Sequence, residues 1–418
     1  MKLEKIGFYT LEDNRAKNAD INSPLWRNEL IITSRCNFNC PYCRGTDING
    51  NKGDMSFDDI KNTINIWAND NLQNIRFSGG EPTLHPYIKD IIKYTKEKCK
   101  NIKHIAVSTN GYNNFELYKE LIEIGVNDYS ISLDACCSSI GDMMAGGIKG
   151  AWVKVVDNIK KLSEITYVTV GVVLTPENID TINDIVEYAH NLGVADIRLI
   201  TAAQWNDFEA FKKINIKEEI LDSHPILKYR VNHFNIGRNV RGIKSEDFKK
   251  CGLILDDMIV KGKYHYPCVI KMREGCKPIG ELNKNSRKDR YEYFKNHNCF
   301  TDEICKNNCL DVCIDYNNKY IKFQCEKSYL PKLDSTLFTS SEWASGQIAD
   351  LGIECRYDCI IHPLNKQILQ KYAIGWCYGE NLMCRPKENQ VAVMFKRDDK
   401  TFWFHLRNSE FFEVFVNY

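Results

Sequence analysis

The sequence predicts an α/β protein built on a partial (β/α)6 barrel of the TIM type. Six short apolar segments alternate with amphipathic segments between residues 30 and 200, and short loops join them. Strands and helices that alternate in this way form βαβ units around a parallel sheet. Further along, the sequence predicts a small cysteine-rich α+β domain and then a C-terminal α+β segment.

The strand candidates are short and apolar, and the helix candidates between them carry apolar residues at helical spacing. In Phe57–Asn69, for example, Ile60, Ile64 and Trp67 fall on one face. The expected strands are Leu30–Thr33, Ile75–Ser78, His104–Ser108, Tyr129–Leu133, Tyr167–Leu174 and Asp196–Ile200. The expected helices are Phe57–Asn69, Pro86–Lys98, Phe115–Ile124, Val153–Ile165 and Ile179–Leu192.

Changes in composition divide the 418 residues into five parts. The expected parts are an N-terminal extension (1–24), the barrel (25–205), a connector (206–250), the cysteine-rich domain (251–330) and a C-terminal domain of unknown type (331–418). The last part ends in strand-like alternation at Gln390–Phe395 and Thr401–Leu406.

Composition indicates an ordinary globular protein. Hydrophobic residues make up 43% and charged residues 27%, and the net charge is +1. The charge gives no electrostatic reason to expect a nucleic-acid or membrane surface. No apolar run approaches the ~20 residues of a membrane span, and the first five residues lack the apolar core of a signal peptide. We therefore expect a cytoplasmic protein.

Three cysteines directly after the first expected strand are the main chemical feature. Cys36, Cys40 and Cys43 stand at spacings of four and three, with Tyr42 before the last. The 18 cysteines of this chain indicate metal binding or redox chemistry rather than disulfides in a reducing compartment. Four-iron clusters are normally held by four cysteines, so three thiolates would leave one iron open to a substrate or cofactor. A structural zinc site is the alternative interpretation.

Polar and glycine residues follow each of the next three expected strands. Gly79, Gly80 and Glu81 follow the second, Ser108 and Asn110 lie at the end of the third, and Ser132 and Asp134 at the end of the fourth. Parallel α/β folds place their sites at the carboxyl ends of the strands. We therefore expect these residues on one rim with the three cysteines, although such residues are also common in turns.

The cysteine spacing over residues 36–43, with Gly79-Gly80-Glu81-Pro82, resembles the radical S-adenosylmethionine (radical SAM) family. The resemblance covers about residues 25–205. It implies a [4Fe–4S] cluster on Cys36, Cys40 and Cys43, with SAM at the open iron. It also implies SAM contacts from eight residues: Tyr42, Gly79, Gly80, Glu81, Ser108, Asn110, Ser132 and Asp134. Among these, Glu81 and the glycine backbone would hold the SAM ammonium group.

One departure from the family concerns the SAM carboxylate. Many relatives carry an arginine where this chain reads Asp142-Met143-Met144-Ala145-Gly146-Gly147. Another partner, such as Arg198 or a lysine, would have to replace it. Asn178, after the fifth strand, is a weaker candidate contact.

The cysteine-rich part resembles the SPASM/twitch extension of radical SAM enzymes. Met258–Cys268 is expected to form a hairpin turning at Gly262-Lys263, and Ile279-Gly280 echoes a further step of the pattern. The resemblance implies one auxiliary iron–sulfur cluster and allows a second one. A zinc-bound mini-domain is the alternative. The implied ligands are Cys251, Cys268, Cys299, Cys305, Cys309 and Cys325, with Cys276 and Cys313 as further candidates.

The extension departs from its relatives at two positions. Asn296 stands where a cysteine is expected, and Val269 follows Cys268 where sulfatase-maturing relatives carry an aspartate that accepts a proton. Cys355, Cys359, Cys377 and Cys384 form a looser set that we interpret as buried thiols. The histidines are few and scattered and show no sign of a metal site.

The resemblance implies an oxidoreductase that reductively cleaves SAM to a 5′-deoxyadenosyl radical and abstracts hydrogen from a substrate C–H bond. Flavodoxin or ferredoxin would be the electron donor. A peptide or protein side chain is the first substrate hypothesis, with residues 331–418 as a recognition domain. A small molecule, nucleotide or nucleic-acid base is the second. A non-catalytic iron–sulfur or zinc protein is the third hypothesis, and it predicts no SAM cleavage.

Overall fold

The barrel sheet is the centre of the molecule. The computed structural model describes residues 15–44, 53–203, 205, 207–244, 247–321 and 323, together with three strands between residues 373 and 406. Its main sheet has nine strands in the order β6-β5-β4-β3-β2-β1-β7-β8-β9. The first six are β1 (Arg27–Thr33), β2 (Asn74–Gly79), β3 (His104–Thr109), β4 (Asp128–Ser132), β5 (Tyr167–Leu174) and β6 (Asp196–Thr201).

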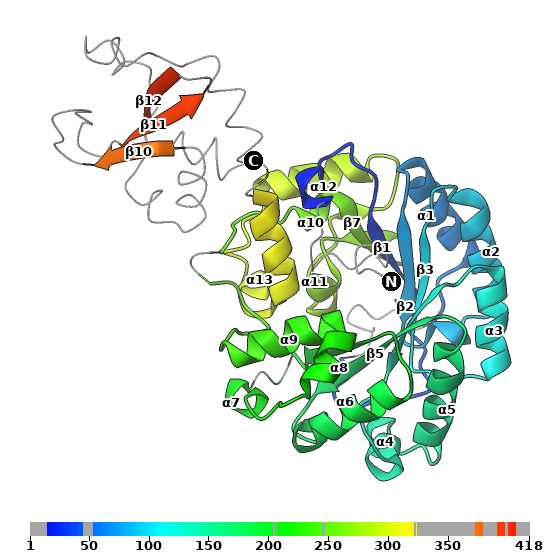
Figure 1. Cartoon of the computed structure of the whole chain (residues 1–418). Coiled ribbons are helices and arrows are strands. Elements are labelled where there is room, and N and C mark those ends of the chain that lie inside the picture. Colours follow the sequence, from blue (N-terminus) through cyan, green and yellow to red (C-terminus); the bar gives the residue numbers. More distant parts are fainter. Residues whose placement is uncertain are drawn as a thin grey trace, which may run out of the picture.

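These six strands are parallel, and each lies beside its predecessor in the chain. The expected partial barrel is therefore confirmed, and all six expected strands are present with ends shifted by at most a few residues. Because the order is sequential, every connection crosses on the same side of the sheet, and the helices lie outside the strands (Figure 1).

The outer helices form where the apolar spacing predicts them. Ser56 caps the first helix by accepting a hydrogen bond from the Asp59 amide, and Ile60, Ile64 and Trp67 are fully buried. The helices are α1 (Phe57–Asn69), α2 (Ile88–Lys98), α3 (Phe115–Ile124), α4 (Ser138–Met144), α5 (Ala151–Ser163) and α6 (Ile182–Asn191), with 3-10 turns η2 (Arg15–Lys17), η3 (Pro82–Leu84) and η4 (Ile179–Thr181). The sequence did not predict α4.

The cysteine-rich part continues the barrel sheet. Strand β7 (Asp257–Lys261) pairs in parallel with β1, in a register that places Arg27 opposite Asp257. Strand β8 (Tyr264–Tyr266) returns through a turn at Gly262, where φ is +59°, and β9 (Gly280–Glu281) adds the last strand. The expected hairpin is present, and the expected division between 25–205 and 251–330 crosses one continuous sheet.

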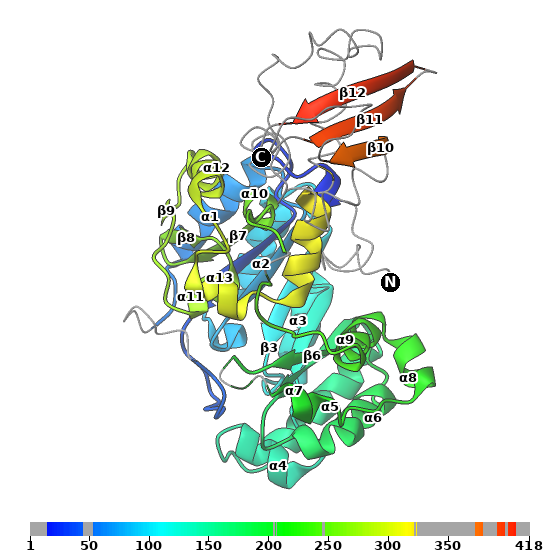
Figure 2. The same ribbon diagram turned by 90° about the vertical axis from the view of Figure 1, so that its left-hand side faces the viewer.

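Short helices complete this part of the chain. They are α7 (Phe208–Phe211), α8 (Glu218–Ser223), α9 (Pro225–Asn235), α10 (Leu253–Asp256), α11 (Val269–Arg273), α12 (Ser286–Asn296), α13 (Glu303–Asn308) and a helix over residues 311–321. Seen from the side, α11 and α12 lie against the β7–β9 strands (Figure 2).

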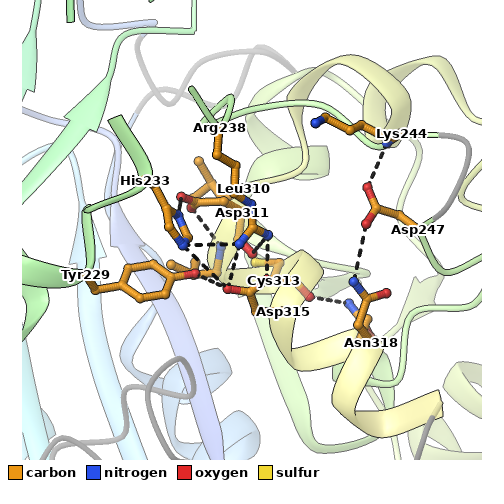
Figure 3. A network of polar contacts seen from close by, with 12 residues as sticks. Tyr229, His233, Arg238, Lys244, Asp247, Leu310, Asp311, Cys313, Asp315 and Asn318 are labelled. Atoms are coloured by element: carbon orange, nitrogen blue, oxygen red, sulfur yellow. Dashed lines mark hydrogen bonds and ion pairs between the residues drawn. The ribbon is translucent and has the colours of Figure 1, made fainter. Parts of the chain in front are cut away.

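A buried polar network fastens the helix over residues 311–321 to α9 (Figure 3). The Asp311 carboxylate is fully buried and forms an ion pair with Arg230 and a 2.6 Å contact with His233 Nδ1. Arg230 also donates to the backbone oxygen of Leu199 in β6 at 3.1 Å. Arg238 pairs with Asp315 one turn further along. These contacts join the barrel to the helix that carries Cys313.

Beyond residue 323 the structure describes only a three-stranded antiparallel sheet. Its strands are β10 (Ala373–Tyr378), β11 (Val391–Arg397) and β12 (Lys400–Leu406), in the order β10-β11-β12. The strand-like alternation expected at its last two strands is confirmed. No helix within the described parts of the chain has the length and apolar character to cross a bilayer.

Candidate functional site: a cysteine-lined cavity at the carboxyl ends of the strands

A cavity of about 290 Å³ lies at the carboxyl ends of the barrel strands. The loop after β1 contributes Cys36, Cys40 and Cys43 to its wall. Residues 36–43 are called the thiol loop. Seven of the eight residues expected to contact SAM line the same cavity: Tyr42, Gly79, Gly80, Ser108, Asn110, Ser132 and Asp134. Residues from the ends of the first four strands therefore lie together, as expected for the carboxyl ends of parallel strands.

Tyr42 anchors the thiol loop to the end of β4. Its hydroxyl donates to Asp134 Oδ2 at 2.5 Å, and Asp134 Oδ1 accepts the Val173 amide of β5 at 2.7 Å. Burial raises the pKa of the Asp134 carboxyl to about 6, although both hydrogen bonds oppose the rise. The aromatic residue before the last cysteine thus holds the loop in place.

Two glycines allow the loop after β2 to pack against the thiol loop. A Cβ atom on Gly79 would lie 2.1 Å from the Thr33 carbonyl oxygen, and one on Gly80 would lie 2.2 Å from that of Arg35. The Glu81 amide donates to the Arg35 oxygen at 2.7 Å. The two glycines therefore let one part of the backbone approach another part closely. From the sequence, we expected them to let the backbone approach a ligand.

Glu81 lies behind the cavity wall, and the structure places it differently from the expected ammonium contact. The side chain is 1% exposed. Its Oε1 atom accepts from the Thr83 hydroxyl at 2.6 Å and the Thr109 hydroxyl at 2.8 Å, while Oε2 accepts the Asn110 amide at 2.7 Å. The carboxylate therefore joins the ends of β2 and β3. Burial raises its pKa.

Two asparagines of the rim are also held by the protein. The Asn110 side chain donates to Asn37 Oδ1 at 2.7 Å and lies 3.9 Å from the Cys36 sulfur. Asn178 is fully buried, donates to the backbone oxygens of Asp134 and Val173, and so fixes the ends of β4 and β5. Asn178 is a positioning residue.

Two arginines line the cavity from opposite parts of the fold. Arg198 comes from β6 and Arg273 from the end of α11, beyond the hairpin. Arg198 is the residue that the sequence suggested for the SAM carboxylate. Arg273 was missed, because only the pairing of β7 with β1 brings α11 to the barrel. Phe38 and Trp152 are further lining residues that the sequence did not indicate.

Cys40 is half-buried, Cys36 and Cys43 are exposed at the cavity, and negative groups lie near them. Burial raises the pKa of Cys36, and it raises that of Cys40 to about 12, with a further contribution from the Asp134 charge. Soft thiolate ligands favour iron–sulfur clusters and zinc, and metal binding releases the thiol protons. Three thiols beside an open, polar cavity fit a cluster with one iron left for another ligand.

A second group of thiols gathers below the hairpin. This second cysteine group consists of Cys251, Cys268, Cys299, Cys305, Cys309 and Cys313. The Cys299 thiol lies in hydrogen-bond contact with those of Cys251 and Cys305, and the Cys309 thiol lies in contact with that of Cys313. Five of the six expected auxiliary ligands and the candidate Cys313 are thus brought together. Cys276 is a nearby half-buried thiol, and Cys325 lies outside the described residues.

The comparison with protein families decides the assignment of the barrel. The profile of the Radical SAM superfamily matches residues 30–189. Residues 30–189 therefore form a radical SAM domain. This match implies SAM and a [4Fe–4S] cluster as cofactors, in agreement with the expectation from the thiol loop. The SPASM/twitch resemblance of the second cysteine group stays a prediction.

Radical SAM relatives among curated proteins match only part of the chain. A GTP 3′,8-cyclase of Vibrio parahaemolyticus is 31% identical over 151 residues, which cover 35% of this chain and 44% of the relative. A probable GTP 3′,8-cyclase of Sulfurisphaera tokodaii is 26% identical, covering 46% and 62%. Molybdenum cofactor biosynthesis protein 1 of Bos taurus is 27% identical, covering 46% and 31%. The chain spans less than two thirds of each relative.

Solved structures give weaker similarities. A histidine-tagged form of anSMEcpe with bound AdoMet is 16% identical with a TM-score of 0.48, over 75% of this chain and 95% of that one. Streptococcus suis SuiB bound to precursor peptide SuiA is 15% identical with a TM-score of 0.45, over 67% and 66%. At this level of similarity, nothing about the site of this chain follows from them.

Proposed function

We propose that this protein is a radical SAM oxidoreductase whose [4Fe–4S] cluster is held by Cys36, Cys40 and Cys43. The observation that carries the proposal is the single cavity shared by these three thiols and the polar strand ends of the barrel. When bound, the reduced cluster and SAM supply a 5′-deoxyadenosyl radical that abstracts hydrogen from a substrate C–H bond.

The protein's own residues position the cofactor and exclude water. Tyr42 and Asp134 hold the thiol loop, and the glycine pair closes the loop after β2 against it. Ser108, Asn110 and Ser132 supply the hydrogen-bonding groups of the wall. Arg198 is the proposed partner of the SAM carboxylate, because it is an arginine of the cavity wall in a chain that lacks the arginine of many relatives near Met144.

The second cysteine group is the proposed site of one auxiliary iron–sulfur cluster. A cluster needs four ligands, and six thiols are gathered there. A flavodoxin or ferredoxin is the proposed electron donor. A reducing, cytoplasmic location would keep these thiols free of disulfides.

An anionic small molecule such as a nucleotide is the substrate class that the site supports best. Arg273 and Arg198 place two positive charges in the cavity wall. Arg44 and Arg241 lie near Arg273. Burial and then the Arg273 charge lower the pKa of Arg44, and burial followed by the charges of Arg44, Arg230 and Arg273 lowers that of Arg241. Arginine forks bind phosphate and carboxylate groups in bidentate fashion. The partial relatives named GTP 3′,8-cyclases agree with this class.

A peptide or protein side chain, the substrate class first predicted from the sequence, is the second candidate. The three-stranded C-terminal sheet would belong to its recognition domain. An acidic peptide would bind to the same arginines. The two substrate classes are therefore distinguished by measuring which compound transfers hydrogen to 5′-deoxyadenosine.

The test is anaerobic reconstitution followed by iron and sulfide counting and an assay for 5′-deoxyadenosine. The proposal predicts about eight irons per chain, counting four for each cluster. Replacing Cys36, Cys40 and Cys43 together with alanine should remove about half of the iron and abolish SAM cleavage, whereas the control Cys137→Ala, with a thiol outside both groups, should retain both. SAM cleavage that survives the triple replacement would show that the proposal is wrong.

The substrate class is tested with deuterated candidates. Deuterium should appear in 5′-deoxyadenosine from a deuterated purine nucleotide and not from deuterated peptides. Arg273→Ala should raise the nucleotide concentration needed for half-maximal transfer by about tenfold or more, since a charge-assisted hydrogen bond contributes about 1.5–3 kcal/mol. Transfer from peptides alone would favour the second candidate.

A further inference from the structure

His297 lies within the second cysteine group, although no metal role was expected for the histidines. Its side-chain donor atom and the sulfur atoms of Cys299 and Cys305 all lie within 4.8 Å of one another. The Nε2 atom is 3.7 Å from the Cys305 sulfur. These three residues fit the pattern H-x-C-x5-C, a spacing that could have drawn attention to His297 in the sequence.

The position of His297 is fixed by the end of α12. Its backbone amide donates to the Tyr293 carbonyl at 2.8 Å and caps the helix. The Tyr293 ring stacks on the imidazole with centroids 4.8 Å apart. The side chain is 13% exposed. The imidazole is therefore held toward the thiols before any metal arrives, which lowers the entropy lost on binding.

The neighbouring residue points the other way. The Asn296 side chain is exposed and donates to the Glu292 carbonyl one helical turn back at 2.9 Å. Asn296 occupies the place where the SPASM/twitch pattern has a cysteine. The chain therefore lacks a thiol at that place but presents an imidazole one residue later.

The distances fit coordination of both donor atoms to one metal ion. Metal–sulfur bonds of about 2.3 Å and metal–nitrogen bonds of about 2.0–2.1 Å at a tetrahedral ion separate the two donor atoms by roughly 3.6 Å. The observed separation between His297 Nε2 and the Cys305 sulfur is 3.7 Å. The Cys299 thiol also reaches Cys251, which offers a fourth donor.

We propose that His297 is a nitrogen ligand of the metal centre in the second cysteine group, beside Cys299 and Cys305. The inference rests on the proposed auxiliary centre and deepens it: the centre has mixed imidazole–thiolate ligation instead of four thiolates. Both iron–sulfur clusters and zinc accept such a ligand set. For an iron–sulfur cluster, a histidine in place of a thiolate raises the reduction potential, as it does in Rieske centres.

The experiment observes this centre alone. The 418-residue chain with Cys36, Cys40 and Cys43 replaced by alanine is reconstituted with iron and sulfide, or loaded with zinc, so that the thiol loop contributes no signal. Metal and sulfide are counted, and imidazole ligation is read from X-ray absorption at the metal edge. For a reduced cluster it is also read from the nitrogen hyperfine coupling, which changes when the histidines carry nitrogen-15.

Three variants in this background make the test specific. His297→Ala should lose the imidazole signal and bind the metal at least tenfold more weakly, as expected when a ligand is removed. His297→Cys should retain the metal, lose the imidazole signal and, for an iron–sulfur cluster, show a lower reduction potential. Asn296→Ala, the matched control, should leave metal content, imidazole signal and potential unchanged.

The outcomes separate this inference from the proposal on which it rests. Iron with matching sulfide, or zinc without sulfide, each supports the inference if the imidazole signal is present and depends on His297. A metal-loaded centre without an imidazole signal overturns the inference and leaves the auxiliary centre standing. A parent chain that folds but binds neither metal overturns both.

Discussion

The buried Asp311 carboxylate should control how firmly the helix over residues 311–321 is attached to the barrel. Asp311 is fully buried, and its partner Arg230 has a side chain that is 6% exposed. Burial opposes ionisation of Asp311, but the Arg230 charge and the hydrogen bond with His233 outweigh it and lower the carboxyl pKa. Asp311→Asn keeps the shape and leaves the buried guanidinium without its counter-charge.

The expected loss follows from the burial of the pair. Breaking a buried ion pair by removing one partner costs about 3–5 kcal/mol, because the other charge stays buried. Exposed ion pairs contribute only about 0–1 kcal/mol. The matched control is Glu187→Gln, which neutralises a carboxylate whose ion pair with Lys217 has side chains 45% and 58% exposed. The two substitutions change charge alike and differ in burial.

Urea unfolding of the reconstituted protein, followed by circular dichroism, gives both differences in the free energy of unfolding. Iron content after gel filtration gives a second measurement, because the same helix carries Cys313. Asp311→Asn should lose about 3–5 kcal/mol and part of its auxiliary iron, and Glu187→Gln less than about 1 kcal/mol. If Asp311→Asn stays within about 1 kcal/mol of the parent, the network does not fasten the helix as described.

Three further changes test separate features. Gly80→Ala should destabilise the fold by about 1–3 kcal/mol and weaken SAM binding in equilibrium dialysis, because its Cβ meets the Arg35 carbonyl at 2.2 Å. The control Gly280→Ala, whose Cβ would have its nearest neighbour at an ordinary 3.6 Å, should bind SAM normally. Asn178→Ala should cost about 1–3 kcal/mol in urea unfolding through unpaired strand-end groups, and an unchanged midpoint would contradict its positioning role. Burial and the Arg290 charge lower the pKa of His265 to about 3. Above pH 6.5 the ring is neutral in both the folded and the unfolded chain, and below that pH protonation of the unfolded chain reduces the stability, by about 2 kcal/mol at pH 5. His265→Phe should flatten this acid slope, and an equally steep slope in the variant would contradict the assignment.

The sequence predicted the barrel well because its strands are apolar and its outer helices have one buried face. The bounds of Phe57–Asn69, Phe115–Ile124 and Tyr167–Leu174 agree with the structure. Helix α9 was missed because it buries residues on several sides, Arg230 and His233 among them, and so shows no clean polar face.

The sequence predicted which residues lie at the candidate site better than it predicted what each of them does there. The strand-end rule found the thiol loop and the polar rim, because parallel strands end on one edge. It could not tell that Glu81 turns inward to join β2 and β3, since that depends on hydroxyls and an amide of the folded rim. Arg273 and His297 reach their sites only through the β7 pairing and the cap of α12.

The pairing of β7 with β1 also sets an order for folding. Until residues 257–261 have been synthesised, the outer edge of β1 has no partner strand there, although all six barrel strands are already complete. Unpaired strand edges are templates for aggregation. A fragment that stops before β7, including one cut at the end of the family match at residue 189, should therefore self-associate, and expression of the barrel calls for a chain that extends at least through the β7–β8 hairpin.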